Sequence, residues 1–406
     1  MSAARLLAAG IAMALAGEAW AVDFSAHGYL DCRFLARADE RSFADGGLGK
    51  TRFGGGGTDA TCVQAGLSAT AVLTPSLLAQ AELQYQTTDT NSVSLLEAYL
   101  RYRPVSVTPL RWSLKVGTFF PPVSLENDAI GWTSPWTLTS SAINAWIGEE
   151  FRGIGAEGRV EWRGERSTTG AVAALVRSND PAGELLAARG WSLSDLVSGL
   201  GSRVREPDVY AVDENEAVPL RFNPFLENDG RLGWYAGANW EMRGIGSVSI
   251  LRYDNEADPA SFSRGRSPVF SWETDFWSVG ARTRVGDVAL IGQAMTGSTA
   301  IAPSPFFSTA TDFRAAYLLA GWDRGAWRPA LRFDVFSTDQ LPREIANRVR
   351  EHGNAITLAL NWRPRDWLRL TGEALRVRSW RTQRLEEGLA ALQTDTQLQL
   401  GVRVIF

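Results

Sequence analysis

Two adjacent carboxylates, Glu149 and Glu150 in the stretch GEEFRG, are the residues whose types could most directly do chemistry. A pair of carboxyl groups can divide general-acid and general-base work between them. Adjacent residues of a strand point to opposite faces, however, and no Ser-His or Cys-His arrangement accompanies this pair. The only histidines, His27 and His352, lie far apart in the sequence. We therefore predict a protein that is not an enzyme, with no catalytic residue, no bound metal and no cofactor.

The first 21 residues carry a processing signal. Arg5 precedes an apolar stretch, Leu6–Gly17, and a small-x-small motif ends at Ala21, which is typical of a cleaved secretory signal peptide. The apolar stretch is too short to cross a bilayer as a helix, and a buried N-terminal helix is the alternative. We predict that residues 22–406 form the mature protein as a single domain.

Cys32 and Cys62 are the only cysteines, and they flank a glycine-rich stretch. An exported chain reaches an oxidising compartment, in which two such thiols can form a disulfide. Two unpaired thiols are an equal alternative from the sequence alone. The net charge of −4 gives no basic footprint, so we expect no nucleic-acid partner.

The elements that must position the remaining charges are strands, because apolar and polar residues alternate along the chain. In the C-terminal stretch TDTQLQLGVRVIF, Leu398, Leu400 and Val402 share one face, and Gln399 and Arg403 share the other. The stretches LLEAYLRYR, RLGWYAGANWEM, AITLALNW and WLRLTGEA alternate in the same way. An arginine that faces lipid near the membrane midplane costs about 2–4 kcal/mol. The charged face would therefore line the lumen of a barrel, and the apolar face would lie outside.

Connections of two kinds separate these strands. Seven are short and turn-like, and eight are longer, so the pattern predicts sixteen strands with both termini on the short-turn side. Short periplasmic turns, long external loops and an even strand count are typical of a closed, antiparallel, all-β transmembrane barrel of the outer membrane. The eight longer connections are predicted at Ala38–Ala60, Thr88–Val93, Phe119–Gly148, Asn179–Gly230, Glu256–Trp272, Thr299–Thr311, Ser337–Gly353 and Arg381–Thr394.

Tryptophan placement supports the same interpretation. Amphipathic rings gather at the membrane–water interface of membrane proteins, although aromatic residues are also common in any strand. Phe406 ends the apolar face of the last strand at this level, where that strand would close against the first. The tryptophans within a few residues of a short turn are Trp112, Trp162, Trp240, Trp322, Trp327, Trp362 and Trp367.

The third long connection, Phe119–Gly148, is the natural candidate for a constriction loop inside the barrel. Pro121 and Pro122 redirect the chain away from its strand, and Glu126 and Asp128 could place negative charge at an eyelet. A solvated external flap is the alternative. The other candidate constriction residues are Lys115, Arg101, Arg159 and Glu149. The candidate lumen-wall residues are Glu97, Glu157, Arg282, Arg332, Asp334, Arg369, Glu373 and Arg403, any of which could instead only satisfy a neighbouring charge.

The whole mature chain resembles a sixteen-stranded bacterial porin. The stretches HGYLDCRF, LLEAYLRYRP, KVGTFFPPVSLEN, LRFDVFSTD and ITLALNWRPRDWLRLTGEAL resemble the phosphate-selective porin group. The resemblance implies a homotrimer, and a C-terminal phenylalanine, Phe406, that the barrel-assembly machinery reads. In that group lysines and arginines that line the pore give anion specificity, whereas this chain has only two lysines, Lys50 and Lys115.

Two functions from different classes are compatible with these patterns. The first is an outer-membrane porin, a water-filled channel for passive diffusion of small polar or ionic solutes. The second is a structural or surface-interaction barrel whose lumen is plugged by the Asn179–Gly230 loop. Both functions imply contact with membrane lipid and lipopolysaccharide, and single-channel conductance distinguishes them.

Overall fold

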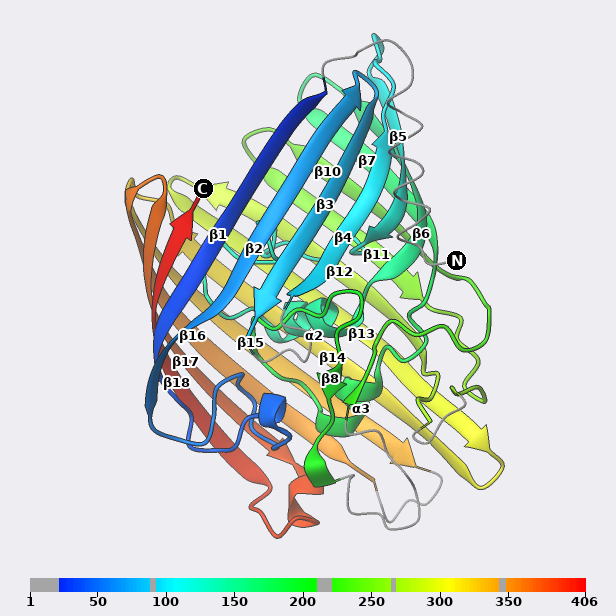
Figure 1. The fold of residues 1–406 in the computed structure, drawn as a ribbon, viewed down its shortest axis with the longest axis vertical. Coiled ribbons are helices and arrows are strands. Elements are labelled where there is room, and N and C mark those ends of the chain that lie inside the picture. The colour runs from blue at the N-terminus through cyan, green and yellow to red at the C-terminus, as the bar shows by residue number, and fades with distance from the viewer. Residues whose placement is uncertain (1–21, 88–92, 210–220, 264–267, 343–347) are drawn as a thin grey trace.

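The computed structural model describes residues 22–87, 93–209, 221–263, 268–342 and 348–406. Within these residues, sixteen strands form one closed antiparallel barrel (Figure 1). Every strand pairs with its neighbours along the chain, and β1 closes against β18. The predicted fold class and strand number are confirmed. The predicted signal peptide lies outside the described residues, and no helix within them is long and apolar enough to cross a membrane.

The barrel strands have the following bounds. The first half comprises β1 Asp23–Ala36, β2 Thr58–Thr74, β3 Leu77–Gln86, β4 Val93–Tyr102, β5 Leu110–Phe119, β6 Gly153–Arg163, β7 Ser167–Arg177 and β10 Gly233–Met242. The second half comprises β11 Gly246–Asp254, β12 Glu273–Val285, β13 Val288–Ser304, β14 Phe307–Trp322, β15 Trp327–Pro342, β16 Arg350–Arg365, β17 Leu368–Arg381 and β18 Leu392–Ile405.

The two faces of the strands are as the alternation predicts. On β18, Leu400 is 62% exposed on the outside, whereas the next inward residue, Gln399, is 2% exposed. Arg403 also points inward and is buried. The apolar outer band and the charged inner face follow from the high cost of a lipid-facing charge.

One predicted loop is wrong. The segment Thr299–Thr311 is strand for most of its length, because β13 and β14 stay paired as far as Ser304 and Phe307. β12 ends its pairing with β13 at Ala300. Beyond that point Pro303 of β13 has no β12 residue opposite it, so its missing N–H leaves no hydrogen bond between these two strands unmade. The predicted connection Ser337–Gly353 is likewise too long, since β15 continues to Pro342 and β16 begins at Arg350.

The short-turn end of the barrel carries the expected aromatic residues. Trp327 and Trp362 stack on adjacent strands with 5.4 Å between ring centroids. Trp112, Trp162 and Trp367 are also exposed beside short turns. These rings mark one membrane–water interface of the barrel.

Phe406 completes the closure of the barrel. Its backbone N–H donates to the Gly28 carbonyl at 3.0 Å, and its own carbonyl accepts from the Gly28 N–H at 2.7 Å. The Phe406 ring lies across Gly28, where a Cβ would approach the ring to 2.8 Å. The ring itself is 65% exposed on the outer face.

We predict that deleting Phe406, or introducing Phe406→Asp, reduces assembly more than conduction. Either change removes the last apolar contact of the seam, and the deletion also removes two closing hydrogen bonds. The amount of heat-modifiable barrel in the outer membrane should fall several-fold, whereas the conductance of each assembled barrel should stay unchanged. Phe406→Tyr is the matched control and should assemble normally. Wild-type amounts of folded barrel in the deletion would contradict the prediction.

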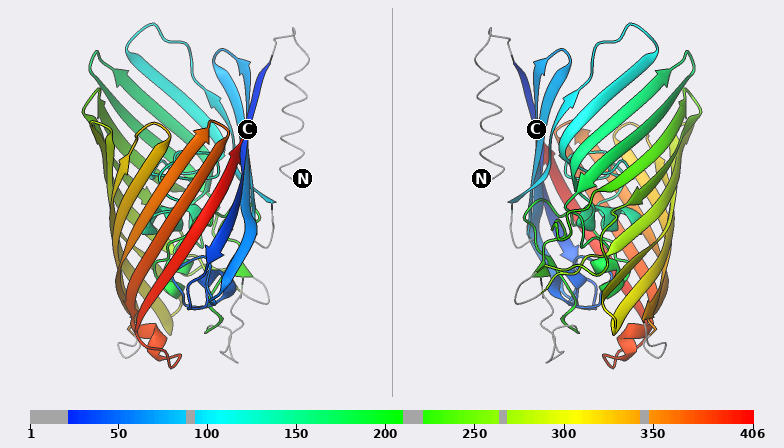
Figure 2. Two further views of the ribbon diagram at one scale, coloured as in Figure 1. Left: turned by 90° about the vertical axis from the view of Figure 1, so that its left-hand side faces the viewer. Right: turned by 90° about the vertical axis from the view of Figure 1, so that its right-hand side faces the viewer.

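Two segments that carry α-helices lie in the lumen between the sixteen strands (Figures 1 and 2). The inner loop, residues 120–152, contains helix α2, Ala142–Glu150, and all nine residues of that helix are buried. The plug segment, residues 179–206, contains helix α3, Glu184–Arg189, and strand β8, Val204–Arg205, which pairs with β9, Arg221–Phe222. Short 3-10 helices, η1 Phe43–Asp45 and η4 Thr382–Leu385, lie in the long connections. Residues 210–220 of the predicted Asn179–Gly230 loop lie outside the described residues.

Candidate functional site in the lumen

An aromatic cluster lies in the middle of the lumen. The Trp146 ring of α2 packs edge-on against Phe313 of β14 and Phe151 of the inner loop, with centroids 4.8 and 4.6 Å away. Trp191 of the plug segment packs against both Trp146 and Phe313. Phe276 of β12 contacts the same cluster. Helix α2 is apolar around most of its circumference, which suits an element buried on all sides. The cluster therefore joins the inner loop, the plug segment and the wall, and it excludes water.

Arg332 of β15 fixes the inner loop to the wall. Its side chain is fully buried, and its Nε donates to Asp334 Oδ2 at 2.9 Å. Nη1 donates to Glu126 Oε2 at 3.3 Å, and the guanidinium also donates to the carbonyls of Thr139 and Ser140 at 2.7 and 2.9 Å. Glu126 in turn accepts from the Ser141 N–H at 2.7 Å. The predicted eyelet residue Glu126 is thus a fully buried partner of Arg332 and presents no free charge to water.

Glu373 of β17 holds the same loop from a second side. Its carboxylate accepts from the backbone N–H groups of Leu138 and Thr139, at 2.6 and 3.1 Å. It also accepts from the Thr139 hydroxyl at 2.6 Å and from Gln399 Nε2 at 3.1 Å. A carboxylate that accepts several hydrogen bonds in this way is a structural anchor.

The plug segment is fastened to the wall near α3. Arg381 of β17 donates to the carbonyls of Ala187 and Ala188, both at 3.1 Å. Glu351 of β16 accepts from the Trp191 N–H at 3.1 Å and forms an ion pair with Lys50 at 2.5 Å. Burial lowers the pKa of Lys50 to about 8.

A second ionic anchor lies further along the plug segment. Asp195 forms ion pairs with Arg33 of β1 at 2.7 Å and with Arg52 at 3.0 Å. Arg33 also pairs with Asp31, at 3.1 Å, and Asp31 pairs with Arg403 of β18. All five side chains are buried, so the network is protected from screening by salt.

Three buried carboxyl groups meet where the inner loop contacts the plug segment. Glu150 Oε1 accepts from the N–H groups of Leu185 and Gly183, at 3.0 and 3.3 Å. Burial raises the pKa of Glu150 to about 7 and the pKa of Glu206 to about 8. Burial and the neighbouring Glu206 carboxyl raise the pKa of Glu184 well above its ordinary value. The packed arrangement therefore favours protonated carboxyls at this junction.

Arg152 links the two segments at the start of β6. Its guanidinium donates to the carbonyls of Gly148 and Ser198, and it lies 3.3 Å from the centroid of the Phe120 ring. Burial lowers the pKa of Arg152 to about 9. Arg152 is not among the residues predicted from the sequence. Its position directly after the apolar loop, and before an alternating strand, is the only signal that marks it.

The predicted residues that remain in contact with water lie nearer the short-turn end. Asp128 is exposed and pairs with half-exposed Arg282 at 3.2 Å. Both residues border a cavity of about 790 Å³ that reaches the short turns around Arg166 and Arg243. A polar vestibule of this size can hold water and small solutes. The vestibule ends at the inner loop, which contributes Asp128 and Trp136 to its lining.

The other predicted constriction and wall residues form local contacts. Lys115 pairs with Glu157 at 3.0 Å, and Arg159 pairs with Glu161 at 2.8 Å. Arg101 lies opposite Lys115 in the β4–β5 register. Three further contacts complete the set: Glu149 pairs with Arg189 of the plug segment, Glu97 accepts from the Phe120 N–H at 2.9 Å, and Arg369 donates to the Ser134 carbonyl at 3.2 Å.

Cys32 and Cys62 form a disulfide. The two residues are opposite each other in the register of β1 and β2. The disulfide thus ties the ends of the connection that carries Lys50 and Arg52 into the lumen.

Comparison with known proteins finds similarity in structure and none in sequence. No family model matches the chain, and no curated protein is significantly similar to it in sequence. The outer membrane channel DcaP of Acinetobacter baumannii is similar in structure, with a TM-score of 0.54, 13% identity, and coverage of 97% of this chain and 100% of that one. The outer membrane protein OmpT of Vibrio cholerae, as a loop L8 deletion mutant, matches with a TM-score of 0.53, 9% identity, and coverage of 95% and 100%.

An anion-selective porin from Comamonas acidovorans matches with a TM-score of 0.50, 11% identity, and coverage of 95% and 100%. At these identities the likeness is one of fold. The closed sixteen-stranded barrel, its apolar outer band and its aromatic belt define a porin-type transmembrane β-barrel of the outer membrane.

Proposed function

We propose that the protein is an outer-membrane channel for small polar or ionic solutes, and that its path opens when the plug segment leaves the lumen. The observation that carries this proposal is the set of ionisable groups that hold the plug segment in the lumen. The plug segment is held by ion pairs and by buried carboxyls whose pKa values lie near neutrality, such as those of Glu150 and Glu206. Groups of this kind can release a segment when their charge changes.

The vestibule supports the same proposal. It is open at the short-turn end, it is lined by charges of both signs, and it stops at the inner loop. A polar vestibule behind a hydrophobic constriction is an arrangement by which channels gate. Names of structurally similar proteins, a channel and an anion-selective porin, support the class of function and leave the solute open.

A second candidate function is a structural or surface-interaction barrel whose lumen stays filled. The aromatic cluster around Trp146 favours it, because apolar packing of this extent is unusual for a water-filled pore. The two candidates differ in one measurable property. A gated channel has an open state with a conductance in a planar bilayer, whereas a permanently filled barrel has none at any pH.

We predict that opening rises from pH 5 to about pH 8. Below pH 4.5 the carboxyls of Glu150, Glu184 and Glu206 are protonated whether the plug segment is docked or free. Their pKa values are raised only in the docked state, so docking is progressively penalised as pH rises from 4.5 to about 8. Lys50 has the opposite effect on docking above pH 8. Burial lowers its pKa to about 8, so above this pH the docked side chain is mostly neutral and docking no longer buries a charge. The open probability should rise at least ten-fold between pH 5 and pH 8, since a difference of one pKa unit between the docked and free states corresponds to a factor of about ten.

Single-channel recording at fixed salt concentration tests this prediction. The matched variant is Glu184→Gln with Glu206→Gln, which keeps the shape of both side chains and removes two titrations. Its open probability should change far less with pH than that of the wild type. Equal wild-type open probability at pH 5 and pH 8 would contradict the pH-controlled release, and absence of conductance at every pH would favour the filled barrel.

A further inference from the structure

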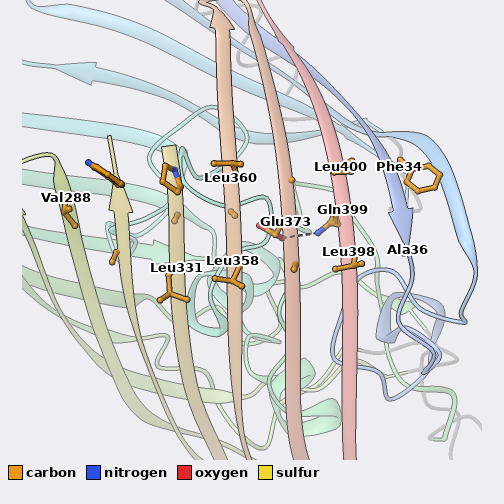
Figure 3. A pocket seen from close by; sticks show the side chains of 17 residues that line it. Phe34, Ala36, Val288, Leu331, Leu358, Leu360, Glu373, Leu398, Gln399 and Leu400 are labelled. Atoms are coloured by element: carbon orange, nitrogen blue, oxygen red, sulfur yellow. Dashed lines mark hydrogen bonds between the residues drawn. The ribbon is translucent and has the colours of Figure 1, made fainter. Parts of the chain in front are cut away.

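The outer face of the barrel carries an apolar groove across β13–β18 and β1 (Figure 3). Its volume is about 770 Å³. Over β17 the groove is lined by two small outward residues, Gly372 and Ala374. The register places leucines of the two adjacent strands opposite these small residues: Leu360 and Leu400 beside Gly372, and Leu358 and Leu398 beside Ala374.

The shape of this groove suits a single hydrocarbon chain. Strands two apart in a sheet are separated by about 10 Å, so the leucine ridges enclose a channel about one acyl chain wide along β17. The four leucines are exposed, and they face outward in the close-up of Figure 3. The groove lies within the apolar band of the barrel, where lipid is the solvent.

Two arginines continue the same outward face of β17 beyond the groove. Arg376 and Arg378 follow Ala374 at alternate positions, and both are exposed. Neither guanidinium pairs with a carboxylate in the part of the chain that the structure describes. Their register neighbours are uncharged: Thr396 and Ile356 flank Arg376, and Thr394 and Asn354 flank Arg378.

The depth of these arginines identifies the leaflet. From Leu368, at the short-turn interface, Arg376 and Arg378 are about 26–33 Å away along the strand, or about 20–25 Å along the membrane normal at a typical strand tilt. The apolar band of such barrels is about 25 Å tall. Trp380, two residues further on, stacks with His352 at 5.0 Å and marks the second aromatic belt. Both guanidinium groups therefore reach the external interface.

We propose that this face binds lipid A, the phosphorylated, multiply acylated glycolipid of the outer leaflet. Arg376 and Arg378 would donate paired hydrogen bonds to a phosphate, which is the geometry that guanidinium groups favour. One acyl chain would lie in the groove over Gly372 and Ala374. An unpaired arginine at a lipid surface needs a counter-charge, and in the external leaflet the lipid phosphate supplies it. The proposal is independent of whether the lumen conducts.

Native mass spectrometry of the full-length barrel, refolded without lipid, tests the proposal with three probes. These are bis-phosphorylated lipid A, the same lipid after removal of its phosphates, and phosphatidylcholine. Arg376→Gln with Arg378→Gln should reduce binding of phosphorylated lipid A about ten-fold and leave binding of the dephosphorylated lipid unchanged. Gly372→Leu with Ala374→Leu should reduce binding of both lipid A forms.

Two controls exclude a general effect of charge removal and a loss of folding. Arg365→Gln removes the same charge from an exposed position at the short-turn end of β16, and it should bind lipid A like the wild type. The groove variant should fold, because a Cβ at Gly372 meets only Leu400 Cδ2, at 3.5 Å, and heat-modifiable migration verifies this.

Three outcomes would overturn the proposal. One is wild-type lipid A binding by the double arginine variant. Another is equal binding of phosphorylated and dephosphorylated lipid A by the wild type. The third is a lipid-free oligomer that the groove variant converts to monomer, since the face would then be an interface between copies of this chain.

Discussion

Replacing residues 184–203 with a flexible glycine-serine sequence of equal length should raise the open probability about ten-fold at pH 5, where the wild type is most closed. The replacement removes α3, Trp191 and Asp195, and with them the aromatic and ionic contacts that hold the plug segment. An equal-length linker keeps the spacing between its ends, so the barrel strands are not pulled. Planar-bilayer recordings of purified barrel measure the effect.

A glycine-serine replacement of residues 385–390 is the control. These residues are exposed in the β17–β18 connection, so the change should leave conductance as in the wild type. A plug replacement that folds, as judged by heat-modifiable migration, yet stays closed would contradict gating by the plug segment. The inner loop alone would then close the lumen, and the filled-barrel function would be favoured.

Arg332→Ala should produce the largest loss of stability from a single substitution in the lumen. It leaves Glu126 and Asp334 buried without their counter-charge and leaves the Thr139 and Ser140 carbonyls without a donor. Removing one partner of a buried ion pair costs about 3–5 kcal/mol. We expect a lower temperature for loss of the heat-modifiable folded form.

Two matched variants separate this cause from a general defect. Arg332→Met combined with Glu126→Gln and Asp334→Asn removes the whole charged network, and it should recover much of the loss, because replacing an entire buried network is often nearly neutral. Arg282→Ala breaks the pair with Asp128 and a hydrogen bond to the Leu125 carbonyl, and it should cost less than Arg332→Ala because water can solvate the exposed Asp128 left behind. Equal melting temperatures for Arg332→Ala and the wild type would show that Arg332 does not anchor the inner loop.

The sequence was sufficient for the barrel because its determinants are local and repeated. Period-two alternation specifies which face of β18 or β10 meets lipid, and turn residues specify the strand number. The segment Thr299–Thr311 was predicted as a loop, whereas most of it extends β13 and β14 beyond the end of β12, and local sequence does not distinguish the two. Such a distinction depends on the neighbouring strand, which ends at a position that local sequence does not reveal.

The filling of the lumen was harder to predict because its contacts are remote in sequence. Arg332 and Glu126 are 206 positions apart, and Arg33 and Asp195 are 162 apart. No periodicity links such pairs. One signal was present: the predicted loop Asn179–Gly230 contains Leu185, Leu186, Trp191, Leu193 and Val197, and all five are buried. Apolar residues at this density are unusual in a solvated loop.

The seam between β1 and β18 has a consequence for the order of assembly. Residues from the first long connection cross this seam on the inside, where the Lys50 N–H donates to Asp395 at 2.6 Å and the Phe53 N–H donates to Gln397 at 3.2 Å. A closed cylinder can be packed only through its mouths or before its edges meet. The hydrogen bonds that pack the first long connection in the lumen therefore also link the first and last strands of the chain. Closure of the barrel and packing of the segments in its lumen therefore become one folding event. Assembly machinery that delays closure of the sheet would give these segments time to pack.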